Sequence, residues 1–372
     1  MLGLHSISLT QFKNYSNRSF EFNERIVGIC GNNGVGKTNL LDAIHYICFT
    51  KSYFTRDHIN VQQGRQGFRV EGELELNDKT EKAVCILRET GKKEFSVNDT
   101  AYERFAHHIG RYPCVIIAPD DIQIIIGGSE ERRRLLDALL SQLDAEYLLH
   151  LINYYKILLQ RNSLLKNFAE SGTKPARPDS YRDRSDGDFA LLEVLDGQLA
   201  KPGEYIFEKR KEFLVAFLPE VKKLYIEIAK QYEDVTLIYQ GEMLQLSFVE
   251  LMSANRNKDI VAQRTTGGIH RDDLIFSLDK QPFRNIASQG QRKSLLFALK
   301  LVEMDVLKEN KGFAPILLLD DVFEKLDEDR ISSLLQRVCV QNDGQVFITD
   351  TNEERLRQHL EPLSINYQLI RL

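Results

Sequence analysis

The nine residues GNNGVGKTN, Gly31–Asn39, are the feature of this chain that most limits its possible fold. Their spacing matches G-x-x-x-x-G-K-[ST], a loop whose backbone N–H groups surround phosphates. RIVGIC, a short β-rich run, leads into Gly31, and apolar residues recur at helical spacing after the loop, at Leu40, Leu41, Ile44 and Ile47. The stretch therefore predicts a strand, a phosphate-binding loop and a helix whose N-terminus faces the phosphates.

Each position of this loop has an expected part in holding a nucleotide. Lys37 is expected to reach the β- and γ-phosphates, and Thr38 is expected to bind Mg²⁺ through its hydroxyl. The backbone of the other positions is expected to surround the phosphates: Gly31, Asn32, Asn33, Gly34, Val35, Gly36 and Asn39. The alternative is an ordinary glycine-rich turn, against which the flanking strand and helix argue.

The length and composition are those of a globular protein. With 372 residues the chain exceeds the ~250–300 at which one core stops growing, which predicts two lobes. Hydrophobic residues make up 42% and charged residues 28%, and no apolar run approaches the ~20 residues that span a bilayer. The first residues lack the pattern of a secretory signal, so a cytoplasmic protein without a membrane segment is expected.

Cysteine usage and charge exclude further classes. The five cysteines are scattered and lack C-x-x-C spacing, which disfavours a disulfide framework and a zinc site and predicts reduced packing residues. The net charge of −5 gives no general attraction to nucleic acid. Any DNA binding would therefore need a local basic surface.

Paired carboxylates lie far along the chain, where the aliphatic run Ile316–Leu319 ends at Asp320 and Asp321. The carboxyl ends of strands in α/β sheets are where ligand-binding groups gather. We expect Asp320 to hold the magnesium shell, and Asp321 to orient or deprotonate the attacking water. In the alternative interpretation both are solvated acids of a turn.

A second candidate anion site precedes these carboxylates. Ser288, Gly290 and Gln291 open a run whose apolar residues lie on one helix face, at Leu295, Leu296, Leu299 and Val302. A hydroxyl at a helix N-terminus next to a glycine suits an anion. An ordinary capped helix, which needs only the serine, is the alternative.

These motifs resemble those of the ABC-type ATPases of the SMC class and, within them, the RecF family of bacterial DNA replication and repair proteins. The similarity runs nearly from end to end. The matching stretches are FKNY (Phe12–Tyr15), the P-loop, APDD to RRRLLD (Ala118–Asp137), LLQRNSLLK (Leu158–Lys166), GIHRDDL (Gly268–Leu274), SQGQRKS (Ser288–Ser294) and LLLDD (Leu317–Asp321). The resemblance implies an α/β ABC-type, SMC-like ATPase head with an inserted short helical arm.

Three positions depart from the family pattern. Ile269 stands where the family usually has proline, and Glu324–Asp327 reads EKLD where the family usually has Ser-Glu-Leu-Asp. Asp350 follows Thr349, near the position expected to contact the γ-phosphate. The motifs of the core site are kept, whereas the loop expected to cross between two chains is altered at 324–327.

The resemblance also implies how the motifs work together. Ser288, Gly290 and Gln291 would contact the γ-phosphate of ATP bound to a partner chain, so that two chains enclose two ATP molecules in an ATP-dependent homodimer. Lys13 and Asn14 match family positions that touch the nucleotide. Lys37 and Asp321 would be the catalytic residues of a weak, DNA-stimulated ATPase, with Thr38 and Asp320 at the metal.

The middle of the chain is expected to form the arm. The expected boundaries are 1–120 for the first half of the head with the P-loop, 121–232 for the inserted helical arm, and 233–372 for the second half of the head. Strand signals vanish and helical periodicity takes over in the arm, except between Ser171 and Asp188, where a polar stretch with prolines predicts a loop.

Basic residues gather in this arm. We predict that Arg132, Arg133, Arg134 and Arg161 contact DNA, with further basic residues between Lys166 and Arg184. A solvated helix face is the alternative, since Glu130 and Glu131 offset part of the charge. The RecF resemblance implies ATP-dependent, sequence-independent binding to DNA gaps and junctions, recombinase loading, and RecR- and RecO-like partners.

Two other functions share part of this pattern. The ATP-binding subunit of a membrane transporter would have the same P-loop and carboxylates, but would not require the basic helices, FKNY or GIHRDDL. A structural tether, stabilised by nucleotide but without catalysis, would be excluded by a measured DNA-stimulated ATPase. His270, within GIHRDDL, is interpreted as structural or allosteric in the head rather than catalytic.

Overall fold

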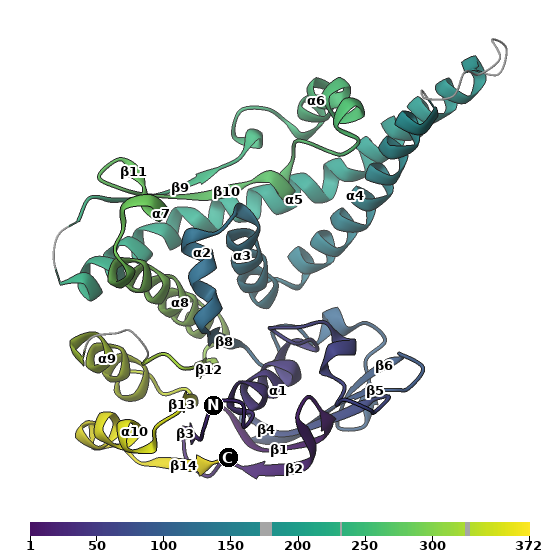
Figure 1. Ribbon diagram of the computed structural model, residues 1–372. Coiled ribbons are helices and arrows are strands. Elements are labelled where there is room, and N and C mark those ends of the chain that lie inside the picture. Colours follow the sequence, from purple (N-terminus) through teal and green to yellow (C-terminus); the bar gives the residue numbers. More distant parts are fainter. Residues whose placement is uncertain (172–180, 231–232, 324–327) are drawn as a thin grey trace. The chain divides into compact units, whose positions relative to one another are not determined.

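The computed structural model describes the whole chain except residues 172–180, 231–232 and 324–327 (Figure 1). The chain forms two compact units, which we call the sheet unit and the helical unit. The sheet unit comprises Met1–Gln123, Lys223–Tyr232 and Ala287–Leu372, and the helical unit comprises Ile124–Lys222 and Glu233–Ile286. The altered loop at 324–327 lies outside the described residues.

A five-stranded parallel sheet, in the order β14-β3-β13-β12-β8, forms the centre of the sheet unit. Its strands are β3 (Ile26–Cys30), β8 (Cys114–Ile117), β12 (Ile316–Leu319), β13 (Val346–Asp350) and β14 (Tyr367–Arg371). All residues of β3, β8, β12 and β13 are buried, which accounts for their nearly unbroken aliphatic sequences. The strands predicted before the P-loop and before Asp320 are both confirmed.

A six-stranded antiparallel sheet, in the order β2-β1-β4-β5-β6-β7, completes the β structure of this unit. Its strands are β1 (Leu2–Phe12), β2 (Tyr15–Glu21), β4 (Phe68–Leu76), β5 (Lys79–Leu87), β6 (Lys93–Val97) and β7 (Thr100–Ala101). Buried and more exposed residues alternate along β4, as expected of a sheet with one face on the core.

Helix α1 (Lys37–Phe49) contacts strands of both sheets, and nearly all its residues are buried. Its apolar side chains join those of β1, β4, β8 and β12 in one core. The P-loop helix is thus held on two sides by sheet. The other helices of this unit are α8 (Gln289–Lys311), α9 (Glu328–Leu335) and α10 (Glu353–Leu360).

The helical unit is built on the neighbouring helices α4 (Ala145–Ser171) and α5 (Tyr181–Ala229) (Figure 1). The last residues of α5, from Lys223 onward, are assigned to the sheet unit. An antiparallel sheet in the order β11-β10-β9 joins these two helices. The remaining elements are α2 (Gln123–Ile126), α3 (Ser129–Leu143), β9 (Val235–Gln240), α6 (Phe248–Ala262), β10 (Asp273–Leu278), β11 (Gln281–Pro282) and α7 (Phe283–Ile286). Among the described residues, no helix has the length and apolarity that a membrane span needs.

The unit boundaries differ from those expected from the sequence. Residues 233–286, expected in the head, group with the arm because β10 contacts α3 and α6 contacts α4. The polar stretch expected as a loop up to Asp188 is helical from Tyr181 onward. Helical periodicity could not reveal this start, because the stretch lacks an apolar stripe. All five cysteines are buried, as expected of packing residues.

Candidate nucleotide-binding site

The P-loop joins the buried strand β3 to α1, as the sequence predicts. The Lys37 Nζ donates hydrogen bonds to the carbonyl oxygens of Gly31 at 2.8 Å and Asn32 at 3.1 Å, so the ammonium lies over the loop. Gly34 and Gly36 have φ angles of 83° and 116°, which favour glycine. A Cβ on Gly36 would lie 2.6 Å from the Asn14 amide nitrogen. The loop can therefore keep this shape only without a side chain there.

The turn between β1 and β2 supports the loop. The Asn14 amide donates to the Val35 carbonyl at 2.9 Å and accepts a hydrogen bond of 2.8 Å from the Asn39 amide. The Tyr15 hydroxyl donates to the Gly36 carbonyl at 2.9 Å. Asn14 and Asn39 thus lie at the loop, and their contact with nucleotide stays a prediction. Tyr15 was named from the sequence only as part of the motif FKNY, and its hydrogen bond to a P-loop carbonyl was missed.

Lys13 has a different contact from the one predicted. Its ammonium forms an ion pair of 2.5 Å with Asp42, a fully buried carboxylate on α1. Asp42 also accepts hydrogen bonds from the Ser52 hydroxyl at 2.6 Å and the Tyr53 backbone N–H at 2.8 Å. Lys13 therefore neutralises a buried acid behind the P-loop, and a contact with nucleotide stays a prediction.

The two residues predicted to hold Mg²⁺, Thr38 and Asp320, are hydrogen-bonded although they are 282 residues apart in the sequence. The Thr38 hydroxyl donates to Asp320 Oδ2 at 2.8 Å, and the Thr349 hydroxyl donates to Asp320 Oδ1 at 2.8 Å. Burial raises the pKa of Asp320, while these hydrogen bonds act in the opposite direction. A hydroxyl and a carboxylate at one point are the hard oxygen ligands that Mg²⁺ takes, so the residues present fit this ion.

Asp321 follows Asp320 with a backbone φ of 51°, a left-handed conformation uncommon outside glycine, asparagine and aspartate. Its N–H donates to the Thr349 hydroxyl oxygen at 2.9 Å. Sequence reasoning named Thr349 only as the neighbour of Asp350. The rule that identified Asp320, a polar residue at the end of a buried parallel strand, also applies to Thr349 on β13.

Asp350, one of the departures from the family pattern, is fully buried. Its carboxylate accepts hydrogen bonds from the Asn352 N–H at 2.7 Å and from the Arg355 guanidinium at 2.7 and 2.8 Å. These contacts hold the turn that leads into α10. Asp350 therefore stabilises the turn between β13 and α10.

Ser288 caps α8, so the helix predicted to begin here is confirmed, while a contact with nucleotide stays a prediction. Its hydroxyl accepts a hydrogen bond of 3.2 Å from the Gln291 N–H, and its own N–H donates to the Gln291 side chain at 2.7 Å. This reciprocal pair is a capping box. A Cβ on Gly290 would collide with the guanidinium of Arg330 on α9. The capping contacts of Ser288 stabilise the N-terminus of α8 and do not involve the P-loop of the same chain.

Two of the four arginines predicted to bind DNA are instead buried within the helical unit. Arg132 is 8% exposed and pairs with both carboxylate oxygens of Asp273, at 2.6 and 3.0 Å. Arg161 is 0% exposed and pairs with Asp196 at 2.6 Å and Asp259 at 2.7 Å. For these two the prediction is wrong, because a guanidinium enclosed and neutralised by carboxylates cannot reach a DNA phosphate.

The other two arginines are more accessible. Arg133 is partly buried and donates to the Asp272 carbonyl at 2.7 Å. The Arg134 side chain is 65% exposed and pairs with Glu130 and Glu131 of its own helix. These two stay predictions as DNA contacts. The basic residues between Lys174 and Arg184 lie outside the residues whose side chains are described.

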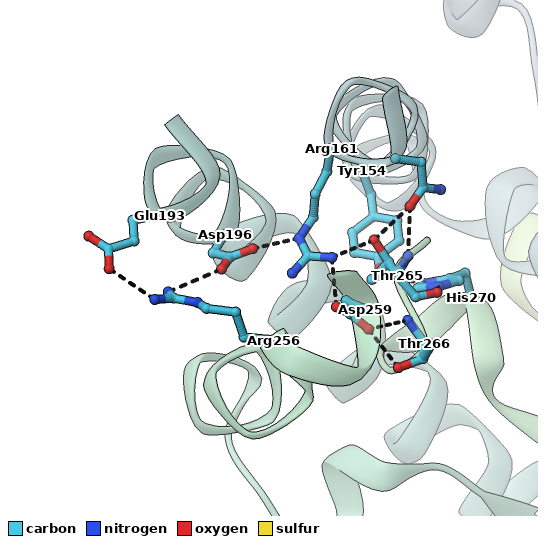
Figure 2. Close-up of polar contacts among 10 residues, drawn as sticks. Tyr154, Arg161, Glu193, Asp196, Arg256, Asp259, Thr265, Thr266 and His270 are labelled. Carbon is cyan, nitrogen blue, oxygen red and sulfur yellow. Dashed lines mark hydrogen bonds and ion pairs between the residues drawn. The ribbon is translucent and has the colours of Figure 1, made fainter. Parts of the chain in front are cut away.

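Figure 2 shows the network around Arg161, which links α4, α5 and α6. Besides its two acids, Arg161 donates to the Thr265 hydroxyl at 2.8 Å. Asp259 accepts from the Thr266 N–H at 2.8 Å, and Asp196 also lies 3.6 Å from the Arg256 guanidinium. The motif LLQRNSLLK is therefore part of the buried framework of the helical unit.

Arg210, a residue that sequence reasoning missed, makes a second network of this kind. It is fully buried and pairs with Asp137 at 2.8 Å and Asp272 at 3.1 Å. Burial raises the pKa of Asp272 to about 6. Asp137 closes the motif RRRLLD and Asp272 lies in GIHRDDL, so these distant motifs meet through one arginine. This network could not be predicted from the sequence, because Asp137 and Asp272 lie in distant motifs and meet only in the folded protein.

His270 lies in the helical unit. Its Nδ1 lies 2.8 Å from the Tyr154 hydroxyl and its Nε2 lies 3.2 Å from the Thr265 carbonyl oxygen. Because the carbonyl can only accept, Nε2 carries the proton of the neutral ring and Nδ1 accepts from Tyr154. Burial lowers the pKa of His270 to about 4. These contacts fit the structural interpretation of His270.

Comparison with known proteins covers nearly the whole chain, and so both units. Residues 3–369 match the family RecF/RecN/SMC N terminal domain. A "DNA replication and repair protein RecF" of Flavobacterium johnsoniae is 41% identical over 370 residues, which cover 99% of each chain. The chain belongs to the RecF family. A RecF of Phocaeicola vulgatus is 37% identical over 98% of this chain and 95% of its own.

Solved structures confirm the fold class. The recombination mediator protein RecF in the RecFOR pathway, solved as RecF-ATP, has a TM-score of 0.83 at 29% identity, covering 95% of this chain and 92% of its own. The Smc head domain of Pyrococcus furiosus has a TM-score of 0.53 at 15% identity, covering 96% and 91%. The expected α/β ABC-type, SMC-like head with a helical insertion is thus confirmed.

Proposed function

We propose that this RecF-family chain is an ATP-dependent DNA-binding protein of recombinational repair and replication. Two chains would enclose two ATP molecules and hold DNA, and weak hydrolysis would release it. The observation that carries the proposal is the hydrogen bond between Thr38 and Asp320. It brings the end of the phosphate loop, which follows β3, next to the carboxylate that follows β12 of the same sheet. An ATP switch needs both parts within reach of the same nucleotide.

The residues have the following parts in the proposed reaction. Lys37 moves from the carbonyls of Gly31 and Asn32 to the outer phosphates. Thr38 and Asp320 hold Mg²⁺, which would neutralise phosphate charge when bound. Asp321 orients the attacking water and accepts its proton. Aspartate is one methylene shorter than the glutamate of many related ATPases, so we expect slow turnover.

The partner chain and the DNA complete this proposal. Ser288, Gly290 and Gln291 of one chain contact the γ-phosphate held by the other, with Lys13 and Asn14 near the nucleotide. Arg133 and Arg134 are the proposed phosphate contacts for gapped or junction DNA. RecR- and RecO-like proteins are the proposed partners, since a solved relative belongs to the RecFOR pathway, and the cytoplasm is the proposed location.

One experiment tests the core of this proposal. Binding of a fluorescent gapped DNA is titrated with ATP, with ADP and without nucleotide, while light scattering follows the mass of the protein. We expect tight DNA binding by a dimer with ATP only. DNA binding that is equal in the three states would contradict the switch. An ATPase that DNA leaves unchanged would favour a transporter-type or structural role.

A further inference from the structure

Thr349 occupies a central position between the two halves of the candidate site. It lies at the end of β13, which pairs with β3 on one side and β12 on the other. Strand β3 leads into the P-loop and β12 leads into Asp320. Thr349 is fully buried. We infer that Thr349 is a positioning residue that sets both acidic groups of the ATPase site through its single hydroxyl, an inference that rests on the proposed function.

The direction of the hydrogen bonds can be deduced from their partners. The Asp321 N–H can only donate, so the Thr349 oxygen must accept that bond of 2.9 Å. The Thr349 hydroxyl proton is then directed to Asp320 Oδ1, at 2.8 Å. The Thr38 proton is directed to the other oxygen, Oδ2, at 2.8 Å. The Thr38 hydroxyl also lies 3.1 Å from Oδ1. The Asp320 carboxylate therefore accepts from two hydroxyls, and together they fix the orientation of the group.

The same hydroxyl fixes the backbone of Asp321. A residue with a φ of 51° is in the left-handed region, which is less favourable for L-residues than the right-handed one. The bond from its N–H to Thr349 opposes relaxation out of this conformation. Because the direction of the Asp321 side chain follows from its backbone, loss of the hydroxyl would redirect the carboxylate that acts on water. Thr349 thus acts through Asp320 and Asp321 without contacting substrate.

The simpler view is that Thr349 only satisfies polar groups at the end of a strand. The two views differ in their consequences for metal binding. A purely structural threonine would change the stability of the sheet unit without changing the Mg²⁺ affinity of the folded protein. A positioning threonine changes Mg²⁺ affinity and turnover in protein that stays folded, and a hydroxyl restores both.

The experiment compares Thr349→Val, which keeps the β-branched shape, with Thr349→Ser, which keeps the hydroxyl. Thr10→Val is the matched control, because Thr10 is also a strand threonine of the sheet unit. ADP binding is measured by calorimetry over a series of free Mg²⁺ concentrations, a readout that needs no hydrolysis. Turnover of ATP is then measured at saturating Mg²⁺.

We expect Thr349→Val to weaken the apparent Mg²⁺ affinity of the ADP complex about tenfold, as the loss of one hydrogen bond to a charged group implies. ADP affinity without Mg²⁺ should be unchanged, since the P-loop is untouched. The kcat should fall about 100-fold with little change in KM, because a displaced catalytic carboxylate acts on the chemical step. Thr349→Ser and Thr10→Val should behave as the wild type.

Wild-type Mg²⁺ affinity and kcat in a folded Thr349→Val protein would overturn the inference. So would a Thr349→Ser protein as impaired as Thr349→Val. If Thr349→Val fails to fold, Thr349→Cys takes its place, since a thiol of similar size is only a weak donor. A wild-type protein without ATPase activity would contradict the proposed function, while the Mg²⁺ dependence of ADP binding would still decide the role of Thr349.

Discussion

At the scale of single residues, the shape of the P-loop depends on the contacts of Gly36 and Lys37. Gly36 must lack a side chain because Asn14 and Tyr15 lie against it, and Lys37 lies over the loop that it was expected to serve. The positions of this glycine and this lysine could be predicted, because the P-loop motif is defined by the spacing of neighbouring residues. Thr349 was missed because its importance depends on the order of strands in the sheet, which no local pattern encodes.

Lys37→Ala tests the loop directly. The ammonium is expected to bind the outer phosphates, and a hydrogen bond to a charged group is worth ~1.5–3 kcal/mol. ATP affinity measured by calorimetry should therefore fall by about tenfold or more. Lys92→Ala is a control in the same unit, since that side chain is 73% exposed. A folded Lys37→Ala protein that binds ATP as the wild type does would show that this loop is not the site.

His270 gives a prediction on pH. Burial lowers its pKa in the folded protein to about 4, from about 6.5 in the unfolded chain. The neutral ring therefore stabilises the fold above pH ~6.5, and this stabilisation is lost as the pH falls through ~4. Over this range the free energy of unfolding of the helical unit should decrease by roughly 1–3 kcal/mol on account of His270.

The measurement is denaturant unfolding of the wild type and of His270→Gln between pH 7 and pH 4. Glutamine does not titrate, so its curve should be flatter with pH even if its stability at pH 7 is lower. Asp272 acts in the opposite direction, because its raised pKa of about 6 favours the folded state at low pH. Since both proteins contain Asp272, equal slopes would contradict the assignment to His270.

At the scale of elements, the helical unit corrects the interpretation of its arginines. Arg161 on α4 and Asp259 on α6 are 98 residues apart in the sequence. The sequence therefore does not show that this arginine is paired, and it was predicted to be accessible to DNA. Buried guanidinium groups of this kind join elements that apolar periodicity alone would leave unconnected. Contacts between segments so far apart in the sequence also explain why residues 233–286 group with the helical unit, unlike the expected boundaries.

Arg161→Ala tests the buried network. Removing one partner of a buried ion pair costs ~3–5 kcal/mol, because the carboxylates of Asp196 and Asp259 lose their counterion. Denaturant unfolding should show this loss. Arg134→Ala, which removes an exposed arginine of the same unit, should cost less than ~1 kcal/mol. An equal effect of the two substitutions would contradict the structural role of Arg161.

At the scale of the whole molecule, the sequence predicted the class of fold and the ends of the strands that carry the site. It did so because buried parallel strands and P-loops have local patterns, and because the motifs match a family. The grouping of distant segments into units could not be predicted, since it depends on pairs such as Arg210 and Asp137 that no local pattern links. The proposed DNA surface depends on that grouping, since two of its four predicted arginines are buried.

The proposed DNA surface can be tested by its dependence on salt. The logarithm of duplex affinity should fall with the logarithm of salt concentration by about 0.9 for each phosphate neutralised. Arg134→Ala should reduce this slope by about one phosphate in the ATP-bound state. Arg88→Ala, which removes an arginine that is 53% exposed in the sheet unit, is the control. An unchanged slope in Arg134→Ala would remove this residue from the DNA path.

The proposed dimer is tested at the start of α8. If Ser288 contacts the nucleotide of a partner chain, Ser288→Arg should prevent dimerisation by placing a bulky side chain where a γ-phosphate must bind. The variant should still bind ATP through its own P-loop as a monomer, because the capping contacts of Ser288 do not involve that loop. Sedimentation with ATP and a nucleotide titration measure the two effects separately.

The loss of a helix cap is itself destabilising by ~1 kcal/mol, so a matched control is needed. Ser247 begins α6 with the same capping box, in which its hydroxyl accepts from the Glu250 N–H. Ser247→Arg therefore loses an equivalent cap at a helix to which no nucleotide contact is assigned, and should dimerise with ATP as the wild type does. If Ser288→Arg also dimerises normally, the two-chain site is wrong and α8 begins with an ordinary cap. If only Ser288→Arg stays monomeric while binding ATP, the start of α8 belongs to the nucleotide of the other chain.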